Sequence, residues 1–209
     1  MSSPTVSKEQ RTAKKFLLIV VAASCLVAAM FGSRNSLSLT IEGIDQSQTL
    51  NYLQISFAFA LGQLVVGAIS PFAGMIADKY GSGKTLTVGI LLGLLGIILI
   101  PYSTTAFTLS ISLGVISSIG LGVAGLPVVL ASVNRLIPQK KIGMAFGLVN
   151  AGQSLGQLIL APLAGFIIVN FGWVLCILFL STVLLLVLPF CFILRSRTDT
   201  KQPSGVQEK

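Results

Sequence analysis

The sequence predicts an all-α integral membrane protein with six transmembrane helices, and three observations carry that prediction. Of the 209 residues, 54% are hydrophobic and only 10% are charged, whereas soluble domains carry roughly 25% charged residues. Six apolar runs are long enough to cross a bilayer core, which takes about 20 helical residues. Thirteen of the fourteen Lys and Arg residues lie in four polar stretches outside these runs.

The six apolar runs are the predicted spans. Backbone groups inside hydrocarbon must bond within their own segment, and the runs lack the alternation of membrane strands, so each is a helix. The predicted spans are residues 16–41, 51–76, 85–104, 106–134, 142–169 and 173–194. They leave a tail at residues 1–15, a six-helix domain at 16–194, and a polar tail at 195–209 that is expected to be disordered.

The basic residues alternate from one side of the membrane to the other. Both tails and the second and fourth loops contain Lys or Arg, whereas the first, third and fifth loops contain neither. Because positive charge marks cytoplasmic loops, both termini are predicted to be cytoplasmic, in the inner or plasma membrane of the cell. The net charge of +8 is therefore interpreted as a topology signal and as contacts with lipid headgroups, not as a nucleic-acid surface.

An internal repeat links the second and fifth spans. Both contain Leu-Gly-Gln-Leu, then Pro-x-Ala-Gly, then a glycine seven residues later. The matching segments are 61–64 and 155–158, 71–74 and 162–165, and Gly81 and Gly172. Since the second span runs inward and the fifth runs outward, the copies are inverted. The pattern predicts a three-plus-three inverted repeat, a building unit of many transporters.

Arg34 is the one basic residue inside a span. Counted at 1.5 Å per residue, it lies about 27 Å from Phe16, in the outer half of the membrane. An isolated Arg there costs at least about 2.5 kcal/mol unless it faces water or a partner. No acidic residue falls within the six spans. We therefore expect Arg34 to face a water-filled cavity, where its guanidinium fork suits a carboxylate. The alternative is that it extends outward to the headgroups.

Other polar residues extend this candidate site. Asn35 and Ser38 follow Arg34 on the same span, and Asn150, Gln153 and Gln157 form one polar face of the fifth span. The three amides either line a cavity or bond to a neighbouring helix; Gln54 and Gln63 in the second span give a weaker signal of the same kind.

Glycine and proline patterns concern packing. Gly pairs at four-residue spacing in the third and fifth spans allow close helix contact: Gly89 with Gly93, Gly143 with Gly147, and Gly152 with Gly156. Pro71, Pro127 and Pro162 are expected to kink their helices.

Enzymatic and metal-binding functions find little support. The chain has no His, and its three Cys residues form no CxxC pair, so we expect neither a zinc site nor any other metal site. There is no nucleophile–base pair, and no cofactor is expected. The stretch 81–85 resembles the end of a phosphate-binding loop, but Asp78 stands where the first Gly is required and no strand precedes it.

The second loop carries the first family resemblance. Residues 74–84 resemble the loop between helices 2 and 3 of the major facilitator superfamily, with Gly83 in place of a basic residue. The resemblance implies a latch that closes the cytoplasmic side of the outward-facing state, in which Asp78 pairs with a basic residue. The matching latch residues are Gly74, Asp78, Lys79, Gly81 and Lys84.

A second resemblance is to one branch of that superfamily. Segments 120–127, 143–147 and 151–163 look like helices 4 and 5 of monocarboxylate transporters and of the oxalate/formate antiporter type. Segment 33–38 is similar to the part of helix 1 where monocarboxylate transporters keep a substrate-contacting Lys, and Arg34 occupies that position. The entry motif of the animal members is absent before Phe16, and Val174 stands where relatives often have Arg.

These resemblances imply one half of a twelve-helix transporter. The expected function is secondary active transport of small organic anions, monocarboxylate or dicarboxylate, by symport or antiport through alternating access. The expected partners are the substrate, the bilayer and a second six-helix half, as a separate chain or as a second copy in a homodimer. No nucleic-acid partner is expected. The alternatives are a non-transporting membrane subunit and a truncated or split transporter fragment.

Overall fold

The computed structural model describes residues 4–47 and 50–194, and within these ranges the chain is helical with no strand. Six helical stretches are long and apolar enough to cross a membrane, and each overlaps one predicted span, which confirms the all-α membrane fold. They are Lys14–Asp45, Tyr52–Tyr80, Ser82–Tyr102, Ala106–Leu136, Gln139–Phe171 and Trp173–Ile193. Most of these stretches begin or end a few residues beyond the predicted limits.

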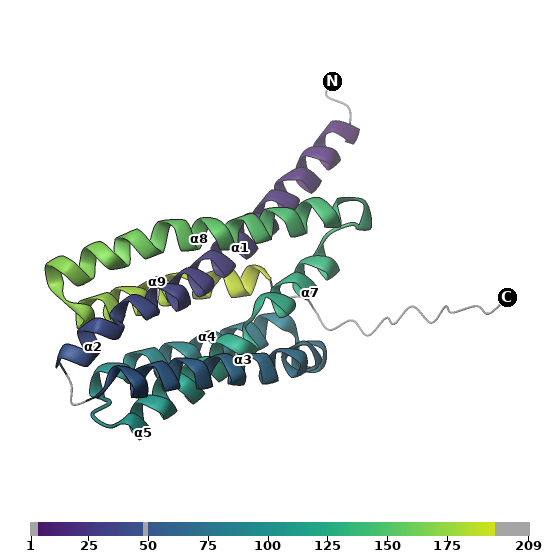
Figure 1. The fold of residues 1–209 in the computed structure, drawn as a ribbon. Coiled ribbons are helices and arrows are strands. Elements are labelled where there is room, and N and C mark those ends of the chain that lie inside the picture. Colours follow the sequence, from purple (N-terminus) through teal and green to yellow (C-terminus); the bar gives the residue numbers. More distant parts are fainter. Residues whose placement is uncertain (1–3, 48–49, 195–209) are drawn as a thin grey trace.

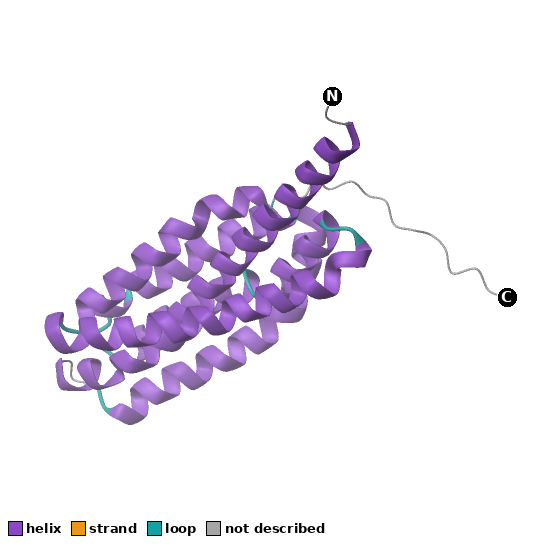
Figure 2. Cartoon of the chain, turned by 90° about the horizontal axis from the view of Figure 1, so that it is seen from above, coloured by secondary structure: helices purple, strands orange, loops and turns teal. Residues whose placement is uncertain are grey.

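The helices follow one another with short connections (Figures 1 and 2). Their bounds are α1 Pro4–Leu37, α2 Ile41–Ser47, α3 Tyr52–Tyr80, α4 Ser82–Ile98, α5 Ala106–Leu109, α6 Ser118–Val123, α7 Leu126–Leu136, α8 Ile142–Phe171 and α9 Trp173–Ile193. A 3-10 turn, Ser38–Thr40, joins α1 to α2, and a π-helix, Ser110–Ser117, joins α5 to α6. The first turns of α1, which begins at Pro4, fall within the predicted N-terminal tail at residues 1–15. The predicted C-terminal tail lies outside the described residues.

The spans form two groups of three. We call α1 with α2 helix 1, and the span from α5 to α7 helix 4. Helix 1 packs chiefly against α8 and α9, whereas helix 4 packs chiefly against α3 and α4, and the two groups lie side by side (Figure 1). The first span of each predicted repeat unit therefore packs against the second and third spans of the other unit.

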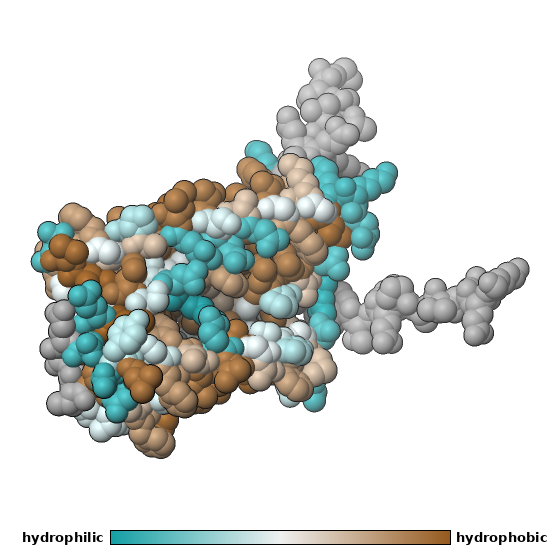
Figure 3. Space-filling model, in the orientation of Figure 1, coloured by the Kyte–Doolittle hydropathy of each residue, from teal (hydrophilic) through white to brown (hydrophobic). Residues whose placement is uncertain are grey.

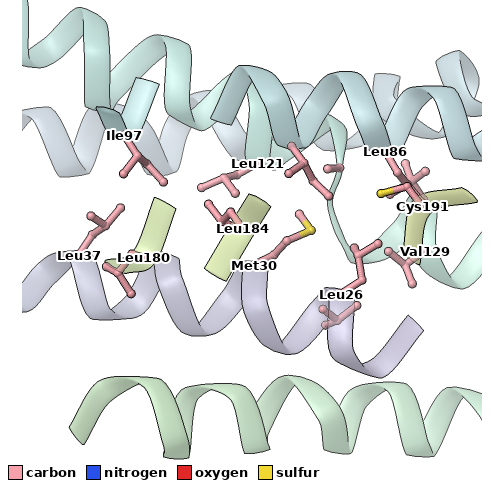
Figure 4. Packing of buried hydrophobic residues seen from close by; sticks show 14 of the residues in the cluster. Leu26, Met30, Leu37, Leu86, Ile97, Leu121, Val129, Leu180, Leu184 and Cys191 are labelled. Carbon is pink, nitrogen blue, oxygen red and sulfur yellow. The ribbon is translucent and has the colours of Figure 1, made fainter. Parts of the chain in front are cut away.

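An apolar core lies between the two groups (Figure 4). Side chains from α1, α4, helix 4 and α9 meet there, and most are almost completely buried. Labelled members include Leu26, Met30, Leu37, Leu86, Ile97, Leu121, Leu180 and Leu184. This packing holds α1 between α8 and the core, which fixes the direction of its polar residues.

Some of the predicted glycine contacts are present and one pair is not. A Cβ at Gly156 would overlap the backbone of Ala28, and a Cβ at Gly120 would overlap that of Gly93. Contact this close is possible only for glycine. At Gly143 and Gly147, in contrast, an added Cβ would meet nothing within 4 Å. This pair therefore mediates no close approach between described helices.

Two matching turns agree with the predicted inverted repeat. Gly81 (φ 91°) joins α3 to α4, and Gly172 (φ 87°) joins α8 to α9. The Gly81 N–H donates to the carbonyl of Ala77 and the Gly172 N–H to that of Ile168, both at 3.0 Å. Side chains disfavour positive φ, so glycine is required at both turns. The repeat itself stays a prediction, with which these turns and the exchanged packing are consistent.

The three prolines that were expected to kink their helices do not all behave alike. Pro71 and Pro162 lie inside α3 and α8, and neither helix is interrupted. Helix 4 is interrupted: Gly125 is extended (φ −60°, ψ 171°), and Pro127 is the second residue of α7. Pro127 lies in the first turn of α7, where the missing N–H costs no helical hydrogen bond, so the extended Gly125 marks the break.

Candidate substrate-binding site

Arg34 lies in the wall of a cavity of about 280 Å³ between α1, α3 and helix 4. Its side chain is partly exposed, and its Nη2 donates a hydrogen bond to Oε1 of Gln63 on α3. Its hydrogen-bonding partner is thus a neutral amide, and no carboxylate among the described residues pairs with its positive charge. An uncompensated guanidinium at a cavity wall attracts an anion.

Two residues that follow Arg34 line the same cavity. Asn35 and Ser38 are both exposed, and Ser38 Oγ donates to the carbonyl of Asn35 at 2.7 Å. The 3-10 turn begins at Ser38 and ends α1 there. The last turn of α1 therefore presents a guanidinium, an amide and a hydroxyl to one space.

Helix 4 supplies the opposite wall. Ser117 and Ser118 line the cavity, although they are 1% and 7% exposed overall. Ser118 Oγ donates to the carbonyl of Leu113 at 3.0 Å, five residues back, as the wider π-helix allows. Sequence reasoning missed both serines, since single hydroxyls in an apolar run give little signal.

A second cavity, of about 100 Å³, adjoins Arg34 on the side nearer the start of α1. It shares Arg34 and Leu121 with the first cavity, but most of its wall is apolar and it lies against the break in helix 4. The other wall residues are Met30, Phe31, Val66, Ser70, Gly125, Leu126 and Pro127. Arg34 thus stands between a polar and an apolar space.

The polar residues around Arg34 divide between two faces of α1. Ser33 and Ser36 are fully buried, and neither hydroxyl oxygen has a hydrogen-bond partner among the described residues. Arg34, Asn35 and Ser38 face the cavity instead. The polar character of segment 33–38 therefore does not mark one continuous wet surface.

The predicted amides of the fifth span are on α8, away from the two cavities. Asn150 is exposed and its Nδ2 donates to the carbonyl of Phe146 in the same helix, at 2.9 Å. Gln153 and Gln157 are partly exposed, and neither of them nor Asn150 lines either space beside Arg34. Hydrophilic residues nevertheless cross the middle of the face that presents α8, α1 and α3, which is hollowed there (Figure 3).

The predicted latch residues surround the turn from α3 to α4. Asp78 forms an ion pair with Arg135 at the end of α7, a residue that local sequence does not distinguish from the other basic residues near the loops. Lys79 Nζ lies 5.4 Å from the centroid of the Tyr80 ring. Gly81 forms the turn, and Lys84 is exposed in the first turn of α4. Gly74 has open space where a Cβ would stand. Asp78 and Arg135 thus join the ends of two spans.

Residues 20–209 match the family model of the Major Facilitator Superfamily. Monocarboxylate transporter 11 of Mus musculus is 25% identical over 85% of the chain and 39% of its own length. Riboflavin transporter RibZ of Clostridioides difficile is 27% identical over 77% of the chain and 34% of its own length. The chain thus spans less than half the length of these curated relatives.

A solved structure shares the fold. The crystal structure of an auto-inhibited POT family peptide transporter superposes with a TM-score of 0.70 at 17% identity, covering 92% of this chain and 40% of that one. At this identity the similarity concerns the arrangement of helices alone. It agrees with the predicted six-helix portion of a larger transporter fold.

Proposed function

The chain belongs to the Major Facilitator Superfamily, and on that premise we propose that it takes part in secondary active transport of small organic anions. In this proposal Arg34 binds a monocarboxylate or dicarboxylate inside an alternating-access cavity. The named relatives carry monocarboxylates or riboflavin, so membership alone leaves the substrate class open. The observation that supports an anion is the charge of Arg34 at the cavity wall.

The hydrogen bonding of Arg34 leaves room for a ligand. A guanidinium has five N–H donors, and Gln63 accepts from one of its nitrogens. The remaining donors are sufficient for the paired hydrogen bonds that carboxylates make with Arg. Asn35 and Ser38 add neutral polar groups to the same wall. Such a site favours negative charge without itself releasing a proton, because Arg stays charged at physiological pH.

A second six-helix half is part of the proposal. In the most apolar stretches of α3 and α8 only 17% of residues are buried, against 61% in helix 4. Five helical glycines with nothing within 4 Å of an added Cβ all lie on these two helices: Gly67, Gly74, Gly143, Gly147 and Gly165. A glycine inside a helix costs about 0.5–1 kcal/mol relative to Ala. Close contact with the helices of another half would use them.

That half is either a separate chain or a second copy of this one. Both arrangements would close the hollowed face of Figure 3 over the candidate site. The amides Asn150, Gln153 and Gln157 on α8 would then face the enclosed passage and extend the binding surface. Both termini lie on the cytoplasmic side in this proposal, which places the Asp78–Arg135 pair and the remaining latch residues there as well.

The experiment compares carboxylate uptake by the wild-type chain and Arg34→Gln, each in membranes with the subunits that co-purify. Losing a charge-assisted pair costs at least about 2 kcal/mol, so we expect binding to fall about 30-fold or more. Membrane insertion should be unchanged. Full anion binding by Arg34→Gln would exclude the assigned role of Arg34.

Thiol labelling separates a transporter from a non-transporting membrane subunit. Ser38→Cys, in a Cys25→Ser background, places a thiol in the cavity wall while the two remaining Cys residues are buried. A membrane-impermeant reagent should label it, and a carboxylate should block the labelling. Labelling that no carboxylate slows, with no uptake, would favour the non-transporting alternative.

A further inference from the structure

The two spaces beside Arg34 differ in chemistry. The larger one holds the polar groups Asn35, Ser38 and Gln63, whereas the smaller one is walled mainly by apolar side chains such as Val66 and Leu126. The one hydroxyl in its wall, Ser70 Oγ, already donates to the carbonyl of Val66 at 2.7 Å. The smaller space therefore suits a hydrocarbon group and offers little to a second charge.

The break in helix 4 places its irregular segment in this wall. The backbone turns out of the helix at Gly125, and Gly125, Leu126 and Pro127 all line the small space. A Cβ at Gly125 would lie 2.9 Å from the carbonyl oxygen of Gly122, so a larger residue at position 125 would require the backbone to shift. A continuous helix would instead carry side chains across this region.

We propose that the small space is an apolar subsite that receives the hydrocarbon chain of a carboxylate whose head group binds Arg34. This inference rests on the proposed function and adds a size limit to it. An apolar protein cavity of about 150 Å³ holds benzene, which has six carbon atoms. By proportion, a space of about 100 Å³ holds about four carbon atoms beyond the carboxyl group. Val66 and Leu126 then determine the longest chain accepted.

Chain length should control affinity within that limit. Each methylene group that leaves water contributes about 0.8 kcal/mol, or about a fourfold gain in affinity. From acetate to pentanoate we therefore expect a stepwise increase of about fourfold per carbon. At hexanoate and longer chains the gain should stop, because the added carbons meet the wall.

The test measures how unbranched carboxylates from acetate to octanoate raise the unfolding temperature of the purified chain together with its co-purifying subunits. Val66→Phe adds four carbon atoms to the wall, so it should shorten the preferred chain by two or more carbons. Leu126→Ala should lengthen it. Val65→Phe is the matched control, since Val65 lines neither space. The unfolding temperature measured without any carboxylate reports that each variant is folded.

Two results would overturn the inference, and they are distinguishable. If acetate stabilises the wild type and both wall variants, but all three share one chain-length profile, the subsite is excluded and Arg34 keeps its proposed role. If no carboxylate stabilises the folded wild type, the proposed function fails and the subsite fails with it. A shift of the profile in opposite directions for Val66→Phe and Leu126→Ala, with none for Val65→Phe, would establish the subsite.

Discussion

Helix 1 and helix 4 hold matching places in the two groups of spans, yet their backbones differ. Helix 1 stays α-helical through Arg34, and its first part, α1, ends at the turn that begins at Ser38. Helix 4 passes through a π-helix, a short α-helix and an extended break at Gly125. Both border the cavities beside Arg34. One span positions a charge, while the irregular span opposite supplies hydroxyls and the wall of a pocket.

The difference has a physical basis in how each helix is held. A Cβ at Gly32 would lie 2.7 Å from the carbonyl oxygen of Gly156, so α1 and α8 touch along their backbones just before Arg34. A charged side chain in the membrane is costly, and a rigid support keeps it directed at its cavity. Helix 4 carries no charge at the site, and π-helical segments are common where function requires irregular backbone.

The largest effect is expected where α8 supports helix 1. The Cβ introduced by Gly156→Ala would overlap the backbone of Ala28, which has no flexible end to move away. We expect a loss of about 3 kcal/mol or more in the free energy of unfolding, at the upper end of overpacking costs. Reversible unfolding by SDS in micelles, followed by circular dichroism, measures it.

Gly147→Ala is the matched control on the same helix. Nothing among the described residues lies within 4 Å of its added Cβ, and Ala is the better helix former, so for the chain unfolded without a second half we expect a gain of about 0.5–1 kcal/mol. Similar stability for the two variants would show that the contact between α1 and α8 does not hold helix 1 in place.

A smaller effect is expected at the matching contact of helix 4. Gly120→Ala would bring a Cβ against the backbone of Gly93 on α4. The affected segment, α6, is bounded by the π-helix and by the break at Gly125, so it has freedom to shift. We expect a loss of about 1–3 kcal/mol in the same SDS unfolding assay. A loss as large as that of Gly156→Ala would mean that helix 4 is as rigidly held as helix 1.

The fold was largely predictable because hydropathy alone determines where a chain crosses a membrane. Hydropathy predicts all six spans to within a few residues, and the sequence repeat pairs Gly81 with Gly172, both of which have positive φ. The break at Gly125 was not found, since all three prolines gave the same sequence signal. Whether a proline interrupts a helix depends on neighbouring spans, which local patterns do not contain.

The candidate site was predictable only in part. Arg34, Asn35 and Ser38 share one cavity, as a polar cluster in an apolar run suggests. The Arg34 partner, Gln63, is 29 residues away and had only a weak signal of its own. The amides of α8 mark a polar face, but periodicity does not say whether that face meets helix 1 or the space beyond it. Contacts of this kind depend on how the helices pack, and the local pattern of one sequence does not show which helices are neighbours.

The smallest effect on stability is expected at the ion pair that joins the far end of helix 4 to α3. The Arg135 and Asp78 side chains are 37% and 61% exposed, and exposed pairs contribute about 1 kcal/mol or less. A double-mutant cycle with Asp78→Asn and Arg135→Gln should therefore give a coupling energy within that range.

The same ion pair should also influence where α7 lies relative to α3, because α7 follows the break at Gly125 and is linked to α3 by this pair. If the pair favours one of two conformations by about 1 kcal/mol, the ratio of their populations changes about fivefold. The labelling rate of Ser38→Cys should shift by up to that factor in Asp78→Asn, while unfolding is scarcely altered. If both single variants destabilise the fold strongly and leave labelling unchanged, the pair serves only stability. In that case α7, the part of helix 4 beyond Gly125, does not move independently of the rest.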